Sequence, residues 1–194
     1  MENPLSEPVL ADPGRRGFLK LGVIGGLALG TVGMGAGLAG CHRNEQASAE
    51  GYQFFRDGDI ALFTALIPAI VANTLTPEPD ARRAGVSEIL LRMDQACLRL
   101  GAPAQKELRQ LFDLLNFGLT RRLAAGVAKP WDQVSEDDAA AFLDRWRNSS
   151  IGLFNAGYRV LIKLPTVTYF TMPQSWAAVG YPGPLKWMFD AINR

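Results

Sequence analysis

The sequence predicts an all-α fold: a single helical domain of about five or six helices that follows an N-terminal signal segment. Apolar residues recur at three- and four-residue spacings along most of the chain after residue 57, which is the period of an amphipathic helix. The β-leaning run 167–170 is too isolated to predict a sheet. Of the 194 residues, 154 follow the first 40, which is enough for one core without disulfide bonds.

The stretch 14–41 has the pattern of an N-terminal export signal. A charged pair precedes a glycine-rich run, and no residue of that run, 21–40, carries a charge. The paired arginines resemble the twin-arginine signal of bacteria, although Gly14 stands where Ser or Thr is usual. The run ends in Leu38-Ala39-Gly40-Cys41, which looks like a lipobox and predicts acylation of Cys41. The export-signal residues are Arg15, Arg16, Phe18, Leu19 and Lys20.

Alternatives remain open for this stretch. The arginine pair also fits an ordinary basic flank, and Cys41 also fits a bystander beside a simple cleavage site. Left uncut, an apolar run of about 20 residues is long enough to span a bilayer. In every case we expect the bulk of the chain outside the cytoplasm. If the lipobox is used, the expected location is the periplasm, with a lipid anchor in a membrane. The expected organisation is a signal peptide with a lipobox end over 1–40, a polar tether over 41–56 and a helical domain over 57–194.

The reactive side chains argue against a catalytic or metal-binding role. With 20 basic and 19 acidic residues the net charge is +1, which gives no sign of a nucleic-acid partner. One histidine and two cysteines supply neither a zinc set nor a haem site, so we expect no cofactor and no metal. The G-x-G-x-x-G pattern at 35–40 lies in the leader and follows no strand. The candidate acids and bases, whose spacing forms no pair or triad, are Asp57, Asp59, Asp144 and Tyr158.

Capping residues and prolines delimit the first three expected helices. Asp57 and Asp59 are candidate N-caps of the first helix, in which Pro68 predicts a kink or a break. The second helix is expected to end with Gly101 as its C-cap, and the third to run from about Pro103 to Gly126.

Two further helices complete the expected domain. Ser135 caps a short one, with Asp138 in the capping-box position. Ser149 or Ser150 opens the last long helix, which Pro165 breaks or bends. Cys97 has no partner in the chain if Cys41 is acylated, so it is either a buried thiol or part of an intermolecular disulfide. The residues expected to face inward include Met93, Leu100, Leu119, Leu123, Trp146 and Ile151.

The C-terminal stretch from residue 169 differs in character from the helices. Proline, glycine and aromatic residues alternate there, and the Gly-Tyr-Pro-Gly-Pro run at 180–184 predicts an irregular tail, because proline removes donors and fixes φ. Aromatic rings beside rigid prolines favour a docking surface, whereas the alternative is that they fill the domain's own core. The candidate partner-binding residues are Tyr169, Trp176, Tyr181, Pro182, Gly183 and Pro184.

These motifs together resemble a known family. The chain has an arginine-pair leader, Leu-Ile-Pro at 66–68, Tyr158-Arg159, Tyr-Phe-Thr at 169–171 and the tail just described. It looks like the gluconate 2-dehydrogenase subunit 3 family, the small (gamma) subunits of periplasmic FAD-dependent sugar and alcohol dehydrogenases. The resemblance covers most of the chain from residue 57 to residue 184. Cys41 is a departure, because many relatives have no cysteine at the end of the leader.

The resemblance implies an accessory, non-catalytic subunit of an oxidoreductase complex. Its partner would be a flavoprotein of the glucose–methanol–choline (GMC) type, carried folded through the twin-arginine translocase, with a multihaem cytochrome c as a further subunit. The alternatives are an envelope lipoprotein with a structural role and no oxidoreductase partner, and a stand-alone enzyme. The sequence does not name the partner's substrate.

Overall fold

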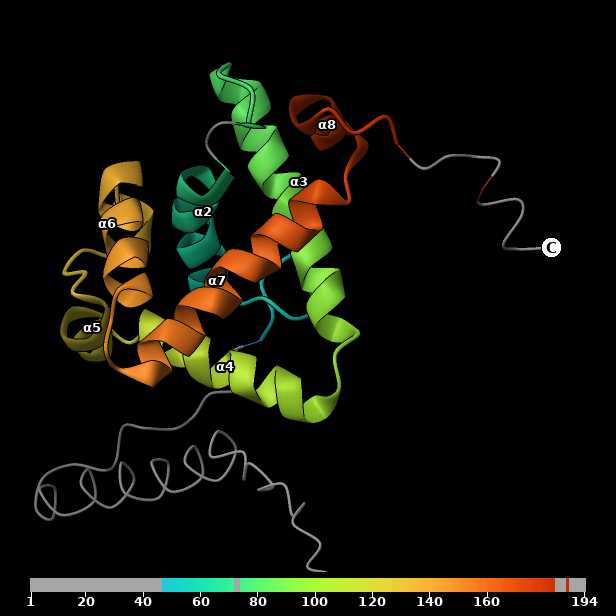
Figure 1. Ribbon diagram of the computed structural model, residues 1–194. Helices are drawn as coiled ribbons and strands as arrows, with labels where there is room; N and C mark the ends of the chain where they lie inside the picture. The colour runs from blue at the N-terminus through green and yellow to red at the C-terminus, as the bar shows by residue number, and fades with distance from the viewer. Residues whose placement is uncertain (1–46, 72–73, 184–187, 189–194) are drawn as a thin grey trace, which may run out of the picture. The chain divides into compact units, whose positions relative to one another are not determined.

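The computed structural model describes residues 47–71, 74–183 and 188, and this part of the chain forms a helical domain (Figure 1). No strand occurs among these residues, so the prediction of an all-α domain is confirmed. Short pieces supplement the long helices: α5 (Gly118–Thr120), a π-helical turn (Arg121–Ala125), α8 (Pro173–Trp176) and two 3-10 turns. The long helices are α2 (Asp57–Val71), α3 (Pro79–Leu98), α4 (Ala102–Asn116), α6 (Glu136–Arg147) and α7 (Gly152–Phe170).

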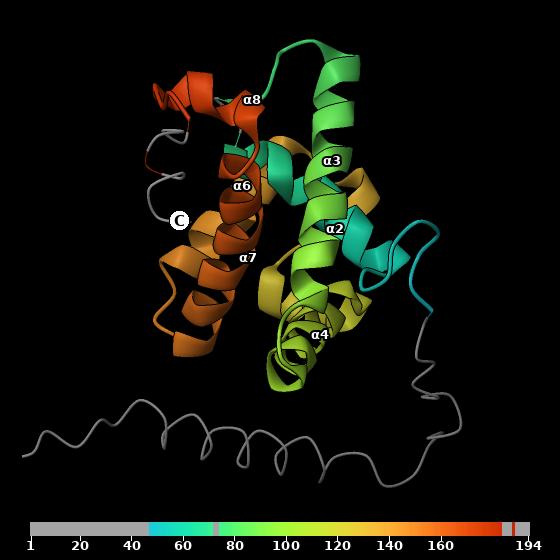
Figure 2. The ribbon, with the colours of Figure 1, turned by 90° about the vertical axis from the view of Figure 1, so that its right-hand side faces the viewer.

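Helix α2 is the centre of the domain. It contacts α3, α4, α6 and α7, and Figures 1 and 2 show it enclosed among them. The apolar face of α2 supplies much of the core. Its burial stabilises the fold, because removing apolar surface from water is the main favourable term in folding. Phe63 of α2 stacks on Phe55 at 5.5 Å between ring centroids and meets Phe112 of α4 edge-on at 5.3 Å.

A second aromatic group joins α6 to α7. Trp146 lies between Phe142 and Phe154, with ring centroids 5.0 and 5.1 Å away, and only 1% of it is exposed. The expected cap of α6 is present, because Ser135 Oγ accepts the N–H of Asp138 at 3.2 Å. A side-chain hydrogen bond from Ser135 to the exposed Asp138 carboxylate is the first cause, ahead of Lys129, of the lowered pKa of that carboxyl.

The N-terminal boundary of the domain lies earlier than predicted. Phe54 and Phe55, assigned to the tether, are 4% and 0% exposed, and the N–H of Ala49 donates to the carbonyl of Phe55. The tether prediction is therefore wrong from residue 49 onward, because two aromatic side chains at 54–55 bury in the core. Residues 41–46 lie outside the described part of the chain.

Of the kink or break predicted at Pro68 and at Pro165, the break does not occur at either proline. Pro68 lies inside α2 and Pro165 inside α7, and both helices continue beyond them. Each proline removes one backbone hydrogen bond, and the packing of both helices in the core offsets this loss. Gly101 is the N-cap of α4 rather than the C-cap of α3, which Arg99 provides.

The third predicted helix is interrupted. Phe117 has extended dihedral angles (φ −72°, ψ 121°), so α4 ends before it, and a new helical turn begins at Gly118. The interruption changes which residues face inward: Leu119 and Leu123 are 59% and 78% exposed, contrary to the prediction. Gly126, with φ +63°, ends the turn as expected. Leu100 and Ile151 are also exposed instead of buried.

Candidate docking surface

Residues 171–183 form a compact turn, with short helical pieces over 173–179 and no regular secondary structure at 181–183. Helix α7 ends at Phe170, and Pro173 begins α8, where a missing N–H is tolerated. Ser175 is fully buried, and its Oγ donates to the carbonyl of Met172 at 2.8 Å. The chain therefore turns sharply after α7 and folds back beside α3 (Figure 1).

Trp176 organises this turn. Its Nε1 donates to the carbonyl of Phe170 at 3.1 Å, and its ring meets Tyr181 edge-on at 5.4 Å between centroids. Gly180 adopts φ +68°, which lets the chain reverse so that the N–H of Tyr181 donates to the carbonyl of Trp176 at 2.9 Å. Gly183 lies directly under the ring: a Cβ there would be 2.9 Å from Cζ3 of Trp176.

The outer side of this turn is an exposed apolar surface, which we call the C-terminal ledge. It consists of large side chains on a backbone that the contacts of Trp176 hold in place. Tyr181 is 48% exposed and Val179 52%, and Trp176 itself is half-buried. The residues of the ledge are Phe170, Trp176, Val179, Tyr181 and Pro182. Such a pre-ordered aromatic surface loses little conformational entropy on binding a protein.

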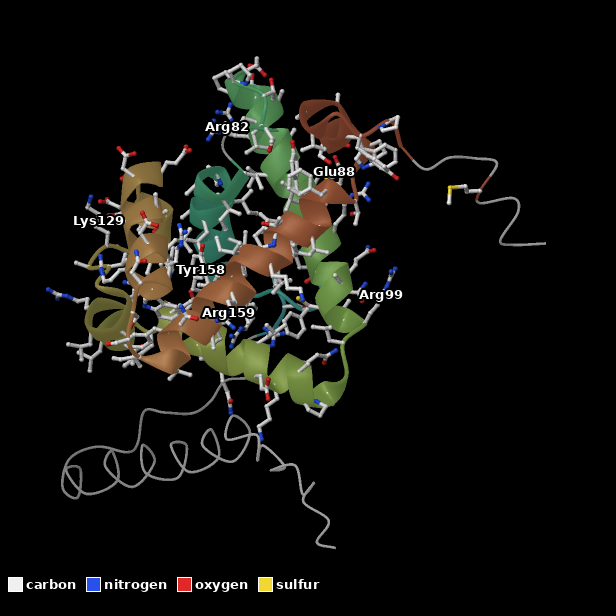
Figure 3. All side chains as sticks on the ribbon, viewed as in Figure 1. Arg82, Glu88, Arg99, Lys129, Tyr158 and Arg159 are labelled. Atoms are coloured by element: carbon white, nitrogen blue, oxygen red, sulfur yellow. The ribbon has the colours of Figure 1, made fainter. Side chains whose placement is uncertain are left out.

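A groove of about 600 Å³ lies beside the ledge, between the start of α3 and the end of α7. Glu88 of α3 points toward α8 (Figure 3), and its carboxylate accepts a hydrogen bond from Nε2 of Gln174 at 3.0 Å. The hydroxyl of Tyr169 donates to the carbonyl of Thr74 at 2.7 Å. The lining includes Thr74, Leu75, Gly85, Glu88, Tyr169 and Met172.

The structure separates the predicted partner-binding residues into three groups. Trp176, Tyr181 and Pro182 are on the ledge, whereas Gly183 is buried and supports it from beneath. Tyr169 is 3% exposed and bonded to Thr74, so its assignment to the docking surface is wrong and it belongs to the core. The other predicted positions lie outside the described residues: Pro184, Arg15, Arg16, Phe18, Leu19, Lys20 and Cys41.

Sequence reasoning missed a buried carboxylate that binds the first segment of the domain. Asp94 of α3 is 3% exposed and accepts the backbone N–H groups of Gln53, Phe54 and Phe55 at 3.0, 2.8 and 2.7 Å. Three charge-assisted hydrogen bonds fix the entry of the chain into the domain. Because the donors lie about 40 residues away in sequence, no local pattern predicts this contact.

Asp59, one of the candidate catalytic acids, is the second buried carboxylate. Its oxygens accept hydrogen bonds from Arg56, Arg109 and Asn116, all within 3.2 Å, and none of it is exposed. Burial depresses the pKa of Arg56, but Asp59 and then Asp113 more than offset this, so the net shift is upward. Burial and the neighbouring Arg56 lower the pKa of Arg109.

The four candidate acids and bases do not assemble into a site. Asp57 and Asp144 are exposed, Tyr158 is half-buried on α7, and the oxygens of Asp59 are occupied by its ion pairs. Among the described residues no side-chain hydrogen bond joins any two of them. The same part of the chain holds no group of three or more metal-ligating side chains.

Cys97 lies inside the core of the domain. It is fully buried on α3, and burial, followed by the charge of Asp94, raises the pKa of its thiol to about 12. The thiol is therefore protonated at neutral pH, and a disulfide to a partner chain would require α3 to move.

No protein-family model, no curated protein and no solved structure matches this chain. Within the described residues, no helix is both long and apolar enough to cross a bilayer. The ledge is accordingly interpreted from its own chemistry and from the sequence motifs.

Proposed function

We propose that this chain is the non-catalytic small subunit of a periplasmic FAD-dependent sugar or alcohol dehydrogenase complex. It escorts the folded flavoprotein subunit, an oxidoreductase of the GMC type, through twin-arginine export and supports its maturation. A multihaem cytochrome c is the third subunit, and acylation of Cys41 holds the complex at a membrane.

The observation that carries the proposal is the C-terminal ledge. Four of its five residues belong to the tail motif by which the sequence resembles the small subunits, and Trp176 and Tyr181 present their rings at the surface. Large aromatic side chains with a hydrogen-bonded edge are the residues that contribute most to protein–protein binding. An escort needs a firm contact with its cargo, and the ledge offers one.

A pull-down of the tagged full-length chain from its native cells tests this proposal. We expect a much larger chain in the eluate, together with the absorbance spectrum of a flavin. A colourless eluate that contains this chain alone would overturn the proposal and favour the envelope lipoprotein.

The escort role has its own test in the leader. The double substitution Arg15→Lys, Arg16→Lys should retain both this chain and the flavoprotein in the cytoplasm, because the translocase reads the arginine pair. Cell fractionation followed by a flavin-dependent activity stain measures both proteins. Normal export of the flavoprotein in this variant would refute the escort role.

A further inference from the structure

A second exposed apolar surface lies at the other end of the domain, and we call it the basal surface. It is formed by two segments: 117–123, which follows α4, and 147–153, which joins α6 to α7. The five large side chains that it exposes by half or more are Phe117 (62%), Leu119 (59%), Leu123 (78%), Ile151 (50%) and Leu153 (52%). Soluble proteins seldom expose so many large apolar side chains together without a binding partner.

The two segments are neighbours in space. Trp146 connects them, because its Nε1 donates to the carbonyl of Ala124 at 3.0 Å while its ring stacks on Phe154 at 5.1 Å. The guanidinium of Arg145 also donates to the carbonyl of Ala125. In Figure 1, α5 and the beginning of α7 lie together at the lower left of the domain.

The basal surface carries one sign of charge. The two segments contain three basic residues, Arg121, Arg122 and Arg147, and no acidic one, although the whole chain is nearly balanced at 20 basic and 19 acidic residues. Arg122 and Arg147 are exposed beside the apolar side chains, and Arg159 follows on α7 (Figure 3). The matching partner must therefore be both apolar and negatively charged.

We propose that the basal surface docks on an anionic lipid bilayer. Aliphatic and aromatic side chains at the tips of two turns enter the boundary between headgroups and acyl chains, while the flanking arginines meet the lipid phosphates. This inference goes beyond the proposed function and does not depend on it, since it concerns this chain and a membrane alone.

The first segment of the described chain packs on the helix that ends at the basal surface. The segment 47–56, which continues toward the leader, is held on α4 by Arg109, whose Cζ lies 3.9 Å from the centre of the Phe54 ring. Phe117 follows eight residues after Arg109, about 12 Å along the helix axis. The ledge follows the far end of α7, whose 19 residues span about 28 Å, so it stays free for a protein.

Site-directed fluorescence quenching on vesicles tests the proposal. The full chain, made by cell-free synthesis so that the leader stays attached, carries Cys41→Ser and either Leu123→Cys or Val179→Cys. A bimane label attaches only to the introduced cysteine, because the buried thiol of Cys97 does not react. The chain is reconstituted in phosphatidylcholine vesicles with or without phosphatidylglycerol, each containing a doxyl-labelled lipid as quencher.

We expect quenching at position 123 in the vesicles that contain phosphatidylglycerol, and none at position 179 on the ledge. Adding Arg122→Glu and Arg147→Glu should lower the fraction of chains whose basal surface touches the bilayer by more than tenfold. Each arginine is expected to raise the affinity for an anionic surface about fivefold. An unquenched label at position 123, equal quenching at 123 and 179, or no dependence on phosphatidylglycerol would each overturn the proposal. If the label at position 123 becomes shielded from solvent only after the flavoprotein is added, the basal surface is a protein interface and the proposal is wrong.

Discussion

Two tryptophans of this domain each lie over a glycine, but their surroundings differ. A Cβ on Gly157 would lie 2.5 Å from Cζ3 of Trp146, and a Cβ on Gly183 would lie 2.9 Å from Cζ3 of Trp176. Each indole N–H donates to a backbone carbonyl, Trp146 at 3.0 Å and Trp176 at 3.1 Å. The local contact is therefore the same at both places.

The difference is in the rest of each ring's environment. Trp146 has Phe142 on one side and Phe154 on the other, so it joins two helices inside the core. Trp176 meets Tyr181 and Gly183, both from its own turn, and remains half-exposed. A tryptophan packed against a glycine thus fixes how two helices pack when its ring is buried. When one face of its ring is exposed, it shapes a binding surface.

Trp146→Ala is expected to have the largest effect on stability. Removing an enclosed indole leaves a cavity and should lower the free energy of unfolding by about 3–5 kcal/mol. Denaturant titration followed by far-UV circular dichroism measures this change. Trp176→Ala is the matched control, and equal losses for the two variants would contradict the comparison.

Gly157→Ala is expected to have the next largest effect. The added methyl group would collide with Trp146 in a closed space, which should cost about 1–3 kcal/mol by overpacking, even though alanine favours helices. Gly152→Ala, on the same helix with nothing near its Cβ, should leave the protein as stable or more so. If both variants are stabilised, α6 and α7 do not pack as tightly as described.

Trp176→Ala should separate binding from folding. We expect a loss of about 1 kcal/mol in unfolding free energy, because the ring is already half-exposed, but at least a tenfold loss of flavoprotein in the pull-down. Phe117→Ala, on the basal surface, should leave the amount of flavoprotein unchanged. Global unfolding by Trp176→Ala would instead mean that this ring fills the core.

Gly183→Ala is expected to have the smallest effect on global stability, about 1 kcal/mol or less, because the turn can shift outward. Its signature is local: displacement of the ring of Trp176 should alter the near-UV circular dichroism. Gly183 itself has φ +92°, so Gly183→Ala and Gly180→Ala both introduce positive-φ strain. Gly180 has no neighbour within 4 Å of its Cβ, so Gly180→Ala shows the strain without the collision. Identical spectra for the two variants would show that Gly183 does not support the ring.

Features that depend on residues close together in the sequence could be predicted. The cap at Ser135, the turn at Gly126 and the buried face of α6 depend on neighbours within a few positions, and all three are present. The aromatic tail was also identified from composition, and Trp176 and Tyr181 do reach the surface.

Features that depend on distant contacts could not be predicted. The hydroxyl of Tyr169 donates a hydrogen bond to the carbonyl of Thr74, 95 residues earlier. This contact holds the ring in the core, whereas the composition of the tail predicts it at the surface. The extended backbone at Phe117 gives no strong sequence signal, yet it turns Leu119 and Leu123 outward. The 117–123 part of the basal surface follows from that interruption.

Asp94 has a consequence for the order in which the chain acquires its structure. The amides of Phe54 and Phe55 are synthesised early, but the carboxylate that receives them comes about 40 residues later. The segment nearest the leader therefore cannot be fixed until most of α3 has been made. Hydrogen exchange on stalled nascent chains would detect this delay, because the amides at 54 and 55 should gain protection only after residue 94 has left the ribosome. The start of the domain is thus translated first but waits for α3 before its backbone amides find their acceptor.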